Sequence, residues 1–293
     1  MSSRPPALIL DFDASVLKFS DDEIRIPLHD RQEHFRFGCS KSSLSGLEEQ
    51  VGLPAEHGCV FLGSGDYHHL SLLLLKKIAR KYKKFDVVVC DNHPDNMRYP
   101  FGIHCGSWIF HASGIPEIGR IHVVGITSDD ITVKHCLENC LSPLRNGRVT
   151  YWSVGRKAHW LALAGAKKAH RDFDAPGALL DAFAACVADS RHIYLSLDKD
   201  VFAKDVAETN WDQGCFAFEH FETLLAACGD RLVGMDVTGE ISAYRFRGLF
   251  KRALAWWDGI KQPERSRLGE WQEKHRLMNG KIVQLLEKTG GKL

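Results

Sequence analysis

Two carboxylates and an imidazole follow an apolar run in the first third of the chain. Asp91, His93 and Asp95 occupy alternate positions directly after Val-Val-Val-Cys at 87–90. An extended backbone points alternate side chains the same way, so these three can converge on one site. A mixture of oxygen and nitrogen ligands suits Mn²⁺, Zn²⁺ or Fe²⁺ better than Ca²⁺. The pattern therefore predicts a metal site, although caps and turn residues after a strand would produce the same spacing.

A second pair of carboxylates repeats this arrangement further along the chain. Asp198 and Asp200 flank Lys199 at the end of the apolar segment 192–198. Two parallel carboxylates can bridge a pair of divalent ions, which offset the repulsion between the like charges. We expect Lys199 to point away from the two carboxylates. The alternative interpretation is a structural cap at the end of a strand.

A third polar group, Gly-Asp-Tyr-His-His at 65–69, follows the apolar segment 59–62. Glycine permits a tight turn, and a histidine at the start of the next helix can face the same edge of a sheet as the carboxylates. The sequence leaves open whether His68 or His69 does so. A histidine pair that only packs or caps is the other interpretation.

The elements that must position these groups alternate between strands and helices. Apolar, β-branched segments predict strands at 7–11, 59–62, 87–90, 121–125, 149–153, 192–198 and 232–236. Apolar or amphipathic segments predict helices at 70–82, 108–112, 131–140, 178–187, 216–227 and 246–257. The segment 20–37 shows little periodicity. This alternation predicts a mainly parallel sheet covered on both faces by helices.

We expect a single domain over residues 1–293, because the sequence shows no internal repeat, low-complexity segment or clear linker. The segment 264–288 predicts an amphipathic C-terminal helix, since Leu268, Trp271, Met278, Ile282 and Leu285 recur at helical spacing among charges. Such a helix packs either on its own domain or between subunits.

Composition narrows the expected partners. The chain carries 38 basic and 37 acidic residues, a formal net charge of +1, and 44% hydrophobic residues. This balance gives no electrostatic reason to expect nucleic acid or a membrane surface as partner, so a small molecule is expected. The nine scattered cysteines favour reduced thiols. Because we also find no signal peptide or membrane-length apolar run, we expect a cytoplasmic protein.

The ordered set of motifs resembles the arginase and agmatinase (ureohydrolase) superfamily. Gly-Asp-x-His, Asp-x-His-x-Asp and Ser-x-Asp-x-Asp each follow an expected strand, in that order, and the resemblance covers roughly residues 59–240. It implies a three-layer α/β/α fold and two divalent ions per chain, with Mn²⁺ as the expected metal. The resemblance assigns six metal ligands: bridging Asp91 and Asp198, then His68 with Asp95 on one ion and His93 with Asp200 on the other.

The resemblance also implies a reaction. Two ions about 3.5 Å apart that share a water lower its pKa from about 15.7 towards 7, and the bridging hydroxide attacks a guanidino, amidine or amide carbon. His104 resembles the family's proton-carrying histidine, and Glu240 resembles the carboxylate that holds the substrate cation. Asn96 and Arg98 lie in the loop expected to meet the substrate, where Arg98 could clamp a carboxylate. The resemblance is also compatible with assembly into a homo-oligomer.

Three departures from the family pattern bear on these assignments. Tyr67 separates Gly-Asp from the histidines, so His68 becomes the ligand if Tyr67 is an insertion, with His69 as the alternative. One residue more than in the family pattern precedes Glu240. Lys199 takes a position that is usually apolar, which implies either a buried ion pair or a local opening behind its strand.

Two other functions fit parts of the sequence. A binding or regulatory protein that kept this fold but lost turnover would accommodate the insertions beside the motifs. Alternatively, Asp11 and Asp13 after the first strand resemble the nucleophile motif of haloacid-dehalogenase-like phosphatases. That motif requires a lysine before an acidic pair, whereas Lys134 follows the acidic pair at 129–130. The crowded carboxylates favour the metal-dependent hydrolase, because such groups are costly to keep together without cations.

Overall fold

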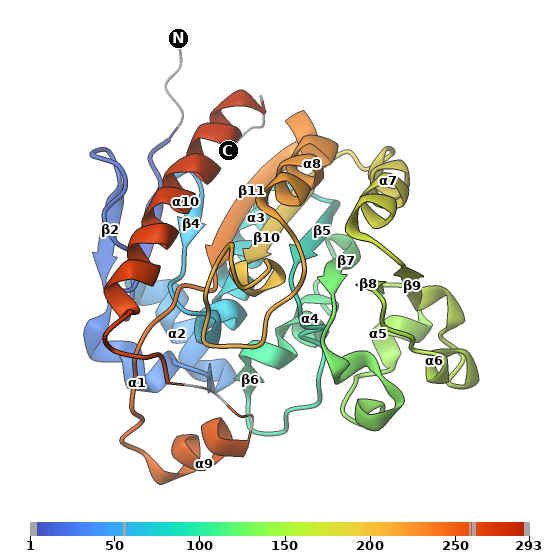
Figure 1. Ribbon diagram of the computed structural model, residues 1–293, viewed down its shortest axis with the longest axis horizontal. Coiled ribbons are helices and arrows are strands. Elements are labelled where there is room, and N and C mark those ends of the chain that lie inside the picture. Colours follow the sequence, from blue (N-terminus) through green and yellow to red (C-terminus); the bar gives the residue numbers. More distant parts are fainter. Residues whose placement is uncertain (1–4, 55–56, 258, 260–261, 290–293) are drawn as a thin grey trace.

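A computed structural model of the protein describes residues 5–54, 57–257, 259 and 262–289. The first four residues, on which the expected lack of a signal peptide partly rests, lie outside these ranges. Among the described residues, nine strands form one sheet in the order β2-β1-β4-β11-β10-β5-β7-β8-β9, and neighbouring strands are parallel (Figure 1). These strands are β1 (Leu8–Asp11), β2 (Ile24–Pro27), β4 (Val60–Phe61), β5 (Phe85–Cys90), β7 (Ile118–Ile126), β8 (Val149–Val154), β9 (His170–Phe173), β10 (Ile193–Asp198) and β11 (Leu232–Thr238).

Helices cover both faces of this sheet. One apolar core joins the sheet to α2 (Lys41–Val51), α3 (Ser71–Lys81), α4 (Trp108–Ala112) and α6 (Trp160–Leu163). The other joins it to α7 (Pro176–Val187), α8 (Phe218–Cys228) and α10 (Leu268–Lys288), which lie in front of the sheet in Figure 1. The three-layer α/β/α fold with a mainly parallel sheet is therefore confirmed.

Strands β5 and β10 are neighbours near the middle of the sheet, and every residue of both is buried. A parallel strand that is covered on both faces needs a nearly continuous apolar run, which Phe-Asp-Val-Val-Val-Cys and Ile-Tyr-Leu-Ser-Leu-Asp supply. Because the two strands run in the same direction, the polar residues that follow them emerge at one edge of the sheet.

The amphipathic C-terminal helix is α10, and it packs on the sheet. Met278, Ile282 and Leu286 belong to the core that includes residues of β10 and β11. These positions are spaced by four residues, so they lie along one face of the helix. Among the described residues, no helix is both long and apolar enough to cross a membrane.

The helix predicted at 131–140 is wrong. Two 3₁₀ turns, Asp129–Ile131 and Val133–His135, take its place, and the backbone at Thr132 between them is extended, with a ψ of 171°. Asn139 then pairs with Met97 in an isolated β-bridge. Tertiary pairing thus overrides the local helical pattern in this segment.

The segment 20–37 is more ordered than its sequence pattern indicates. It contains strand β2 and the short helix α1 (Gln32–Phe35). A two-stranded antiparallel ribbon follows, in which β3 (Gly38–Cys39) pairs with β6 (Ile103–His104). Lys251, in α9 (Leu249–Trp257), places its Nζ 2.8 Å from four backbone carbonyl oxygens of residues 33–38. The predictions also missed β9, α2, α6 and α5 (Ser142–Arg145).

Candidate metal centre

The six predicted ligand residues come together at the carboxyl edge of the sheet. They lie in the segments that directly follow three strands: a 3₁₀ turn after β4, a loop after β5, and the end of β10 with its own 3₁₀ turn. The side chains are His68 after β4, Asp91, His93 and Asp95 after β5, and Asp198 and Asp200 at β10. The buried apolar strands thus hold the start of each polar segment in place.

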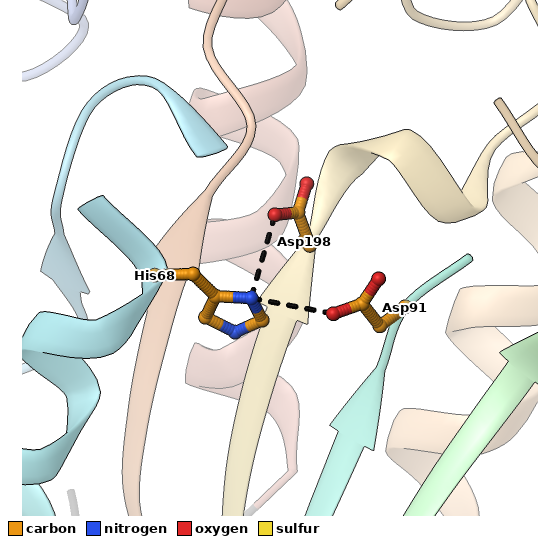
Figure 2. Close-up of side chains that lie close together, drawn as sticks. All are labelled: His68, Asp91 and Asp198. Carbon is orange, nitrogen blue, oxygen red and sulfur yellow. Dashed lines mark ion pairs between the residues drawn. The ribbon is translucent and has the colours of Figure 1, made fainter. Parts of the chain in front are cut away.

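His68 faces three of the carboxylates. Its Nδ1 atom lies 2.9 Å from Asp95 Oδ2, 3.3 Å from Asp91 Oδ2 and 3.5 Å from Asp198 Oδ2. Figure 2 shows the ring of His68 facing the carboxylates of Asp91, which follows β5, and Asp198, at the end of β10. Asp95 adopts a left-handed backbone conformation with φ of 45°, a strained state that is typical of functional sites.

The structure favours His68 over His69 as the histidine of this cluster. His69 is also fully buried, but within the described part of the chain neither of its ring nitrogens has a hydrogen-bond partner. The intervening Tyr67 is accommodated in the core, where its ring stacks on Phe12 at 4.9 Å. Treating Tyr67 as an insertion therefore identifies the residue that the fold brings to the carboxylates.

The side chains form two groups that could each hold a cation. One is His68, Asp91 and Asp198; the other is Asp91, His93 and Asp200. In the second group, His93 Nδ1 lies 2.9 Å from Asp200 Oδ2 and 3.6 Å from Asp91 Oδ1. Asp91 belongs to both groups, which is the arrangement expected of a carboxylate that bridges two ions.

Electrostatics at this cluster fit positively charged ligands. Burial, reinforced by the negative charge of Asp91, raises the pKa values of Asp95 and Asp200 to about 7. Burial and the charge of Asp200 likewise raise the pKa of Asp198 well above its usual value. Burial also opposes ionisation of Asp91, but hydrogen bonds from His68 and His93 outweigh it and lower the pKa. Divalent cations would offset this repulsion, so the residues present fit a two-metal site.

We expect metal binding to weaken as the pH falls below about 7. Without metal, Asp95 and Asp200 take up protons through this range, and they must release them before they can bind a cation. Calorimetric titration with Mn²⁺ between pH 6 and 8, in buffers of different ionisation enthalpy, measures both the affinity and the protons released. A pH-independent affinity without proton release would contradict the raised pKa values.

Buried hydrogen bonds fix the His68 side of the cluster. Nε2 of His68 lies 2.9 Å from Ser196 Oγ, which donates a hydrogen bond of 2.7 Å to Asp236. Tyr194 donates to the other carboxylate oxygen of Asp236 at 2.6 Å. Such contacts to the far side of a metal-binding histidine fix the orientation of its ring.

A cavity of about 260 Å³ opens over the cluster. Its lining includes predicted residues and several that sequence reasoning missed, namely Met97, Asp130, His135, Glu138, Asn139, Trp211 and Asp212. Three of these, His135, Glu138 and Asn139, lie in the segment 131–140 that was predicted as a helix, and this prediction gave them no role at the site. Trp211 and Asp212 lie in the irregular segment after β10. In the sequence, the one indication of a role for them is that an aromatic and an acidic residue follow a strand that carries candidate ligands.

His104 lines the same cavity and is almost completely buried. Its Nδ1 atom accepts a hydrogen bond of 3.0 Å from the backbone N–H of Gly106. Burial, together with the positive charge of Lys251, lowers the pKa of His104 to about 3. The ring is therefore neutral at physiological pH.

Glu240 does not reach the cavity. Its Oε1 atom accepts hydrogen bonds from Lys199 Nζ at 2.5 Å and from Asn279 Nδ2 at 2.8 Å, while His275 lies 3.2 Å from Oε2. Lys199 indeed points away from its two neighbouring aspartates, and it forms a buried ion pair rather than a local opening. The sequence-based role of Glu240, holding a substrate cation, is therefore not supported by its position.

The residue one position earlier cannot take over that role. Gly239 has φ of 86°, a conformation that disfavours other residues, and a Cβ atom there would lie 2.4 Å from Asp198 Oδ1. The carboxylate of this loop thus lies on the α10 side, with Lys199 and Asn279, and not at the cavity.

The predicted substrate residues Asn96 and Arg98 also lie outside the cavity lining. Asn96 is buried and donates hydrogen bonds to Tyr151 Oη at 2.7 Å and to the carbonyl of Cys140 at 3.0 Å. Arg98 is exposed and its Nε donates to the carbonyl of Asn139 at 3.3 Å. Both residues hold the loop after β5 against the segment that carries Asn139.

The residues behind the phosphatase alternative are engaged elsewhere. Asp11 forms an ion pair with Arg25 at 2.9 Å, and Asp13 lies 3.4 Å from the buried guanidinium of Arg36. Neither aspartate lines the cavity. The structure therefore does not favour a nucleophilic role for Asp11.

Fold and site together define an α/β protein with a carboxylate and histidine cluster of metal-binding type at the carboxyl edge of a parallel sheet. The arginase family model matches residues 10–244, and the chain therefore belongs to the arginase family. An uncharacterized protein of Thermotoga maritima is 30% identical over 196 residues, which cover 66% of this chain and 62% of that protein. The match thus spans less than two thirds of the relative's length.

Solved structures of ureohydrolases share the fold. Arginase from Bacillus subtilis matches with a TM-score of 0.55 and 12% identity, over 99% of both chains. Agmatine ureohydrolase of Thermoplasma volcanium matches with a TM-score of 0.52 and 12% identity, over 97% of this chain and 88% of that one. Proclavaminate amidino hydrolase from Streptomyces clavuligerus matches with a TM-score of 0.50 and 17% identity, over 81% and 83%.

Proposed function

We propose that this protein is a two-metal hydrolase that cleaves a C–N bond in a small, positively charged guanidino, amidine or amide compound. Family membership supports the reaction class, and the two ligand groups that share Asp91 support the metal requirement. Mn²⁺ is the proposed metal, because a mixed set of carboxylate and imidazole ligands suits it.

The proposal that the substrate is a cation rests on the charge of the cavity. Its lining holds seven carboxylates and, within the described part of the chain, no lysine or arginine. Four of the carboxylates belong to the metal cluster, and the other three are Asp130, Glu138 and Asp212. A cationic group near these outer carboxylates gains favourable interactions. A substrate carboxylate would find no cationic side chain of this kind there.

The side chains of the cavity suggest how such a substrate is held. Trp211 presents an indole ring that is fixed by a hydrogen bond of 3.2 Å from its Nε1 to Asp66 Oδ1. A planar guanidinium can stack on such a ring. Divalent ions at the cluster would supply an activated water near neutral pH and a Lewis acid for developing negative charge. His104, whose neutral ring lies at the cavity wall, is the proposed residue that accepts a proton during the reaction and passes it to the leaving amine.

The test combines metal content with turnover. Protein purified without chelator and reloaded with Mn²⁺ is expected to hold two ions per chain and to release urea or ammonia from guanidino or amide compounds. His104→Ala is expected to keep both ions, because His104 lies outside the ligand groups, and to lose turnover. A wild-type protein that binds no metal would contradict the proposal. Metal binding without turnover on any such compound would favour a binding or regulatory protein.

A matched pair of substrates tests the charge argument. We expect 4-guanidinobutylamine to be hydrolysed with a kcat/KM at least about tenfold higher than 4-guanidinobutyrate, a difference of ~1.4 kcal/mol. Both compounds have a guanidino group on a four-carbon chain, which ends in an ammonium group in the first and in a carboxylate in the second. Initial rates of urea release measure the ratio. Equal values, or a preference for the acid, would contradict a cavity that selects cations.

A further inference from the structure

His93 contacts a carboxylate on its outer side. Its Nδ1 atom faces Asp91 and Asp200, whereas its Nε2 atom lies 2.9 Å from Asp212 Oδ1. Because a carboxylate only accepts, Nε2 carries the proton in this contact. Nδ1 faces Asp200 Oδ2 at 2.9 Å, so a cation that binds there would replace a proton on Nδ1. The Nε2–H contact with Asp212 would then hold the ring in the tautomer whose Nδ1 lone pair faces the two aspartates, which is the form that binds a metal ion.

Asp212 is held in place by residues beside the metal cluster. Asn92, between two predicted ligands, donates from Nδ2 to the carbonyl of Asp212 at 3.1 Å and to its Oδ2 atom at 3.4 Å. Oδ1 of Asn92 in turn accepts hydrogen bonds from the backbone N–H of Thr127 at 3.1 Å and its hydroxyl at 2.6 Å. Asp212 is thus built into the ligand loop through Asn92 as well as His93.

The two histidines of the cluster differ in their surroundings. The side chain of His68 is 1% exposed and its outer partner, Ser196, is fully buried. The side chain of His93 is 14% exposed and its outer partner, Asp212, is 65% exposed. Moreover, Ser196 lies in β10, whereas Asp212 lies in the irregular segment between the 3₁₀ turn Lys199–Val201 and α8. Water can therefore compete for the hydrogen bonds of Asp212, whereas burial shields Ser196 from water.

We propose that the two metal positions are unequal and that Asp212 controls occupancy of the weaker one, formed by Asp91, His93 and Asp200. This inference rests on the proposed two-metal function. Asp212 is a positioning residue, which keeps His93 in the tautomer and orientation that bind the ion. Loss of such an outer partner typically lowers metal affinity by about 10- to 100-fold. The position formed by His68, Asp91 and Asp198 is supported instead by the buried Ser196 and Asp236, and it is expected to fill first.

Calorimetric titration of the metal-free protein with Mn²⁺ tests the inference, with elemental analysis after dialysis against limiting Mn²⁺. Asp212→Asn is expected to weaken one of the two binding steps by at least about tenfold and to leave the other unchanged. The substitution is mild for folding, because the side chain is largely exposed. Glu138→Gln is the matched control. Glu138 also lines the cavity, is 51% exposed and contacts a histidine, His135, which belongs to neither ligand group.

The outcomes separate this inference from the function on which it rests. Two binding steps in wild type, with only one of them weakened in Asp212→Asn and neither in Glu138→Gln, would support it. Wild-type affinities in Asp212→Asn would overturn it and leave the two-metal hydrolase standing. Equal weakening of both steps, or the same effect in Glu138→Gln, would also overturn it, because general charge loss would then be the cause. A wild-type protein without bound metal would overturn both proposals.

Discussion

Replacement of Asp91 with alanine is expected to abolish binding of both metal ions and to lower kcat/KM by at least about 10³-fold, which corresponds to ~4 kcal/mol of transition-state stabilisation. Among the described residues, Asp91 is the one side chain that belongs to both ligand groups. Its Oδ2 atom lies 3.3 Å from His68 Nδ1 of the first group, and its Oδ1 atom lies 3.6 Å from His93 Nδ1 of the second. Metal analysis and initial rates measure the two effects.

The control for this substitution is Asp129→Ala. Asp129 is a 68% exposed carboxylate that pairs with Arg156 and does not line the cavity. We expect this variant to keep wild-type metal content and activity, because Asp129 is exposed and lies outside the cavity lining. It removes one negative charge, as Asp91→Ala does, so it controls for the change in net charge. Retention of two tightly bound ions in Asp91→Ala would show that Asp91 does not bridge them, and the proposed site would have to be abandoned.

A second large effect is expected at the buried ion pair behind the cluster. Lys199→Met should lower the free energy of unfolding by about 3–5 kcal/mol, because it leaves the Glu240 carboxylate buried without its cation. Both side chains are at most 1% exposed. Burial by itself would raise the pKa of Glu240, but the interactions with Lys199 and then with His275 outweigh burial and lower this pKa to about 2. Urea unfolding of the metal-free protein measures the loss.

Two further variants test whether the unpaired buried charge causes this loss of stability. The double substitution Lys199→Met, Glu240→Leu removes both charges and is expected to recover most of the lost stability. Lys204→Met is the matched control, since Lys204 is 75% exposed in its pair with Glu208 and should contribute less than about 1 kcal/mol. If Lys199→Met were as stable as Lys204→Met, the pair would not hold the end of β10 in place.

The strands that position the cluster could be predicted because their sequences satisfy a strong local requirement. Strands β5 and β10 are buried on both faces, so nearly every position is apolar up to the first ligand. Alternation then places Asp91, His93 and Asp95 on one side. The family resemblance, confirmed by the match over residues 10–244, predicted which strand ends carry side chains that meet in one cluster. Apolar pattern alone does not reveal strand order.

The remaining features depend on contacts between distant residues, which local patterns do not encode. The segment 131–140 has helical spacing, but Asn139 pairs with Met97 in a β-bridge, and the segment takes an irregular conformation that lines the cavity. Glu240 was predicted beside the substrate, yet one extra residue turns it towards Lys199 and α10. Asp212 could not be predicted because its role depends on reaching back to His93, more than a hundred residues earlier.

The contact between Lys199 and the C-terminal helix has a consequence for synthesis of the chain on the ribosome. All candidate ligands lie between residues 68 and 200, so they leave the ribosome before α10 does. Behind them, Lys199 pairs with Glu240, and α10 adds His275, which contacts Lys199, and Asn279, which donates to Glu240. A nascent chain that ends before α10 therefore has its candidate ligands and Glu240 but lacks these two contacts. We expect the end of β10 and the 3₁₀ turn after it, which carry Asp198 and Asp200, to reach their final stability only after α10 has been made.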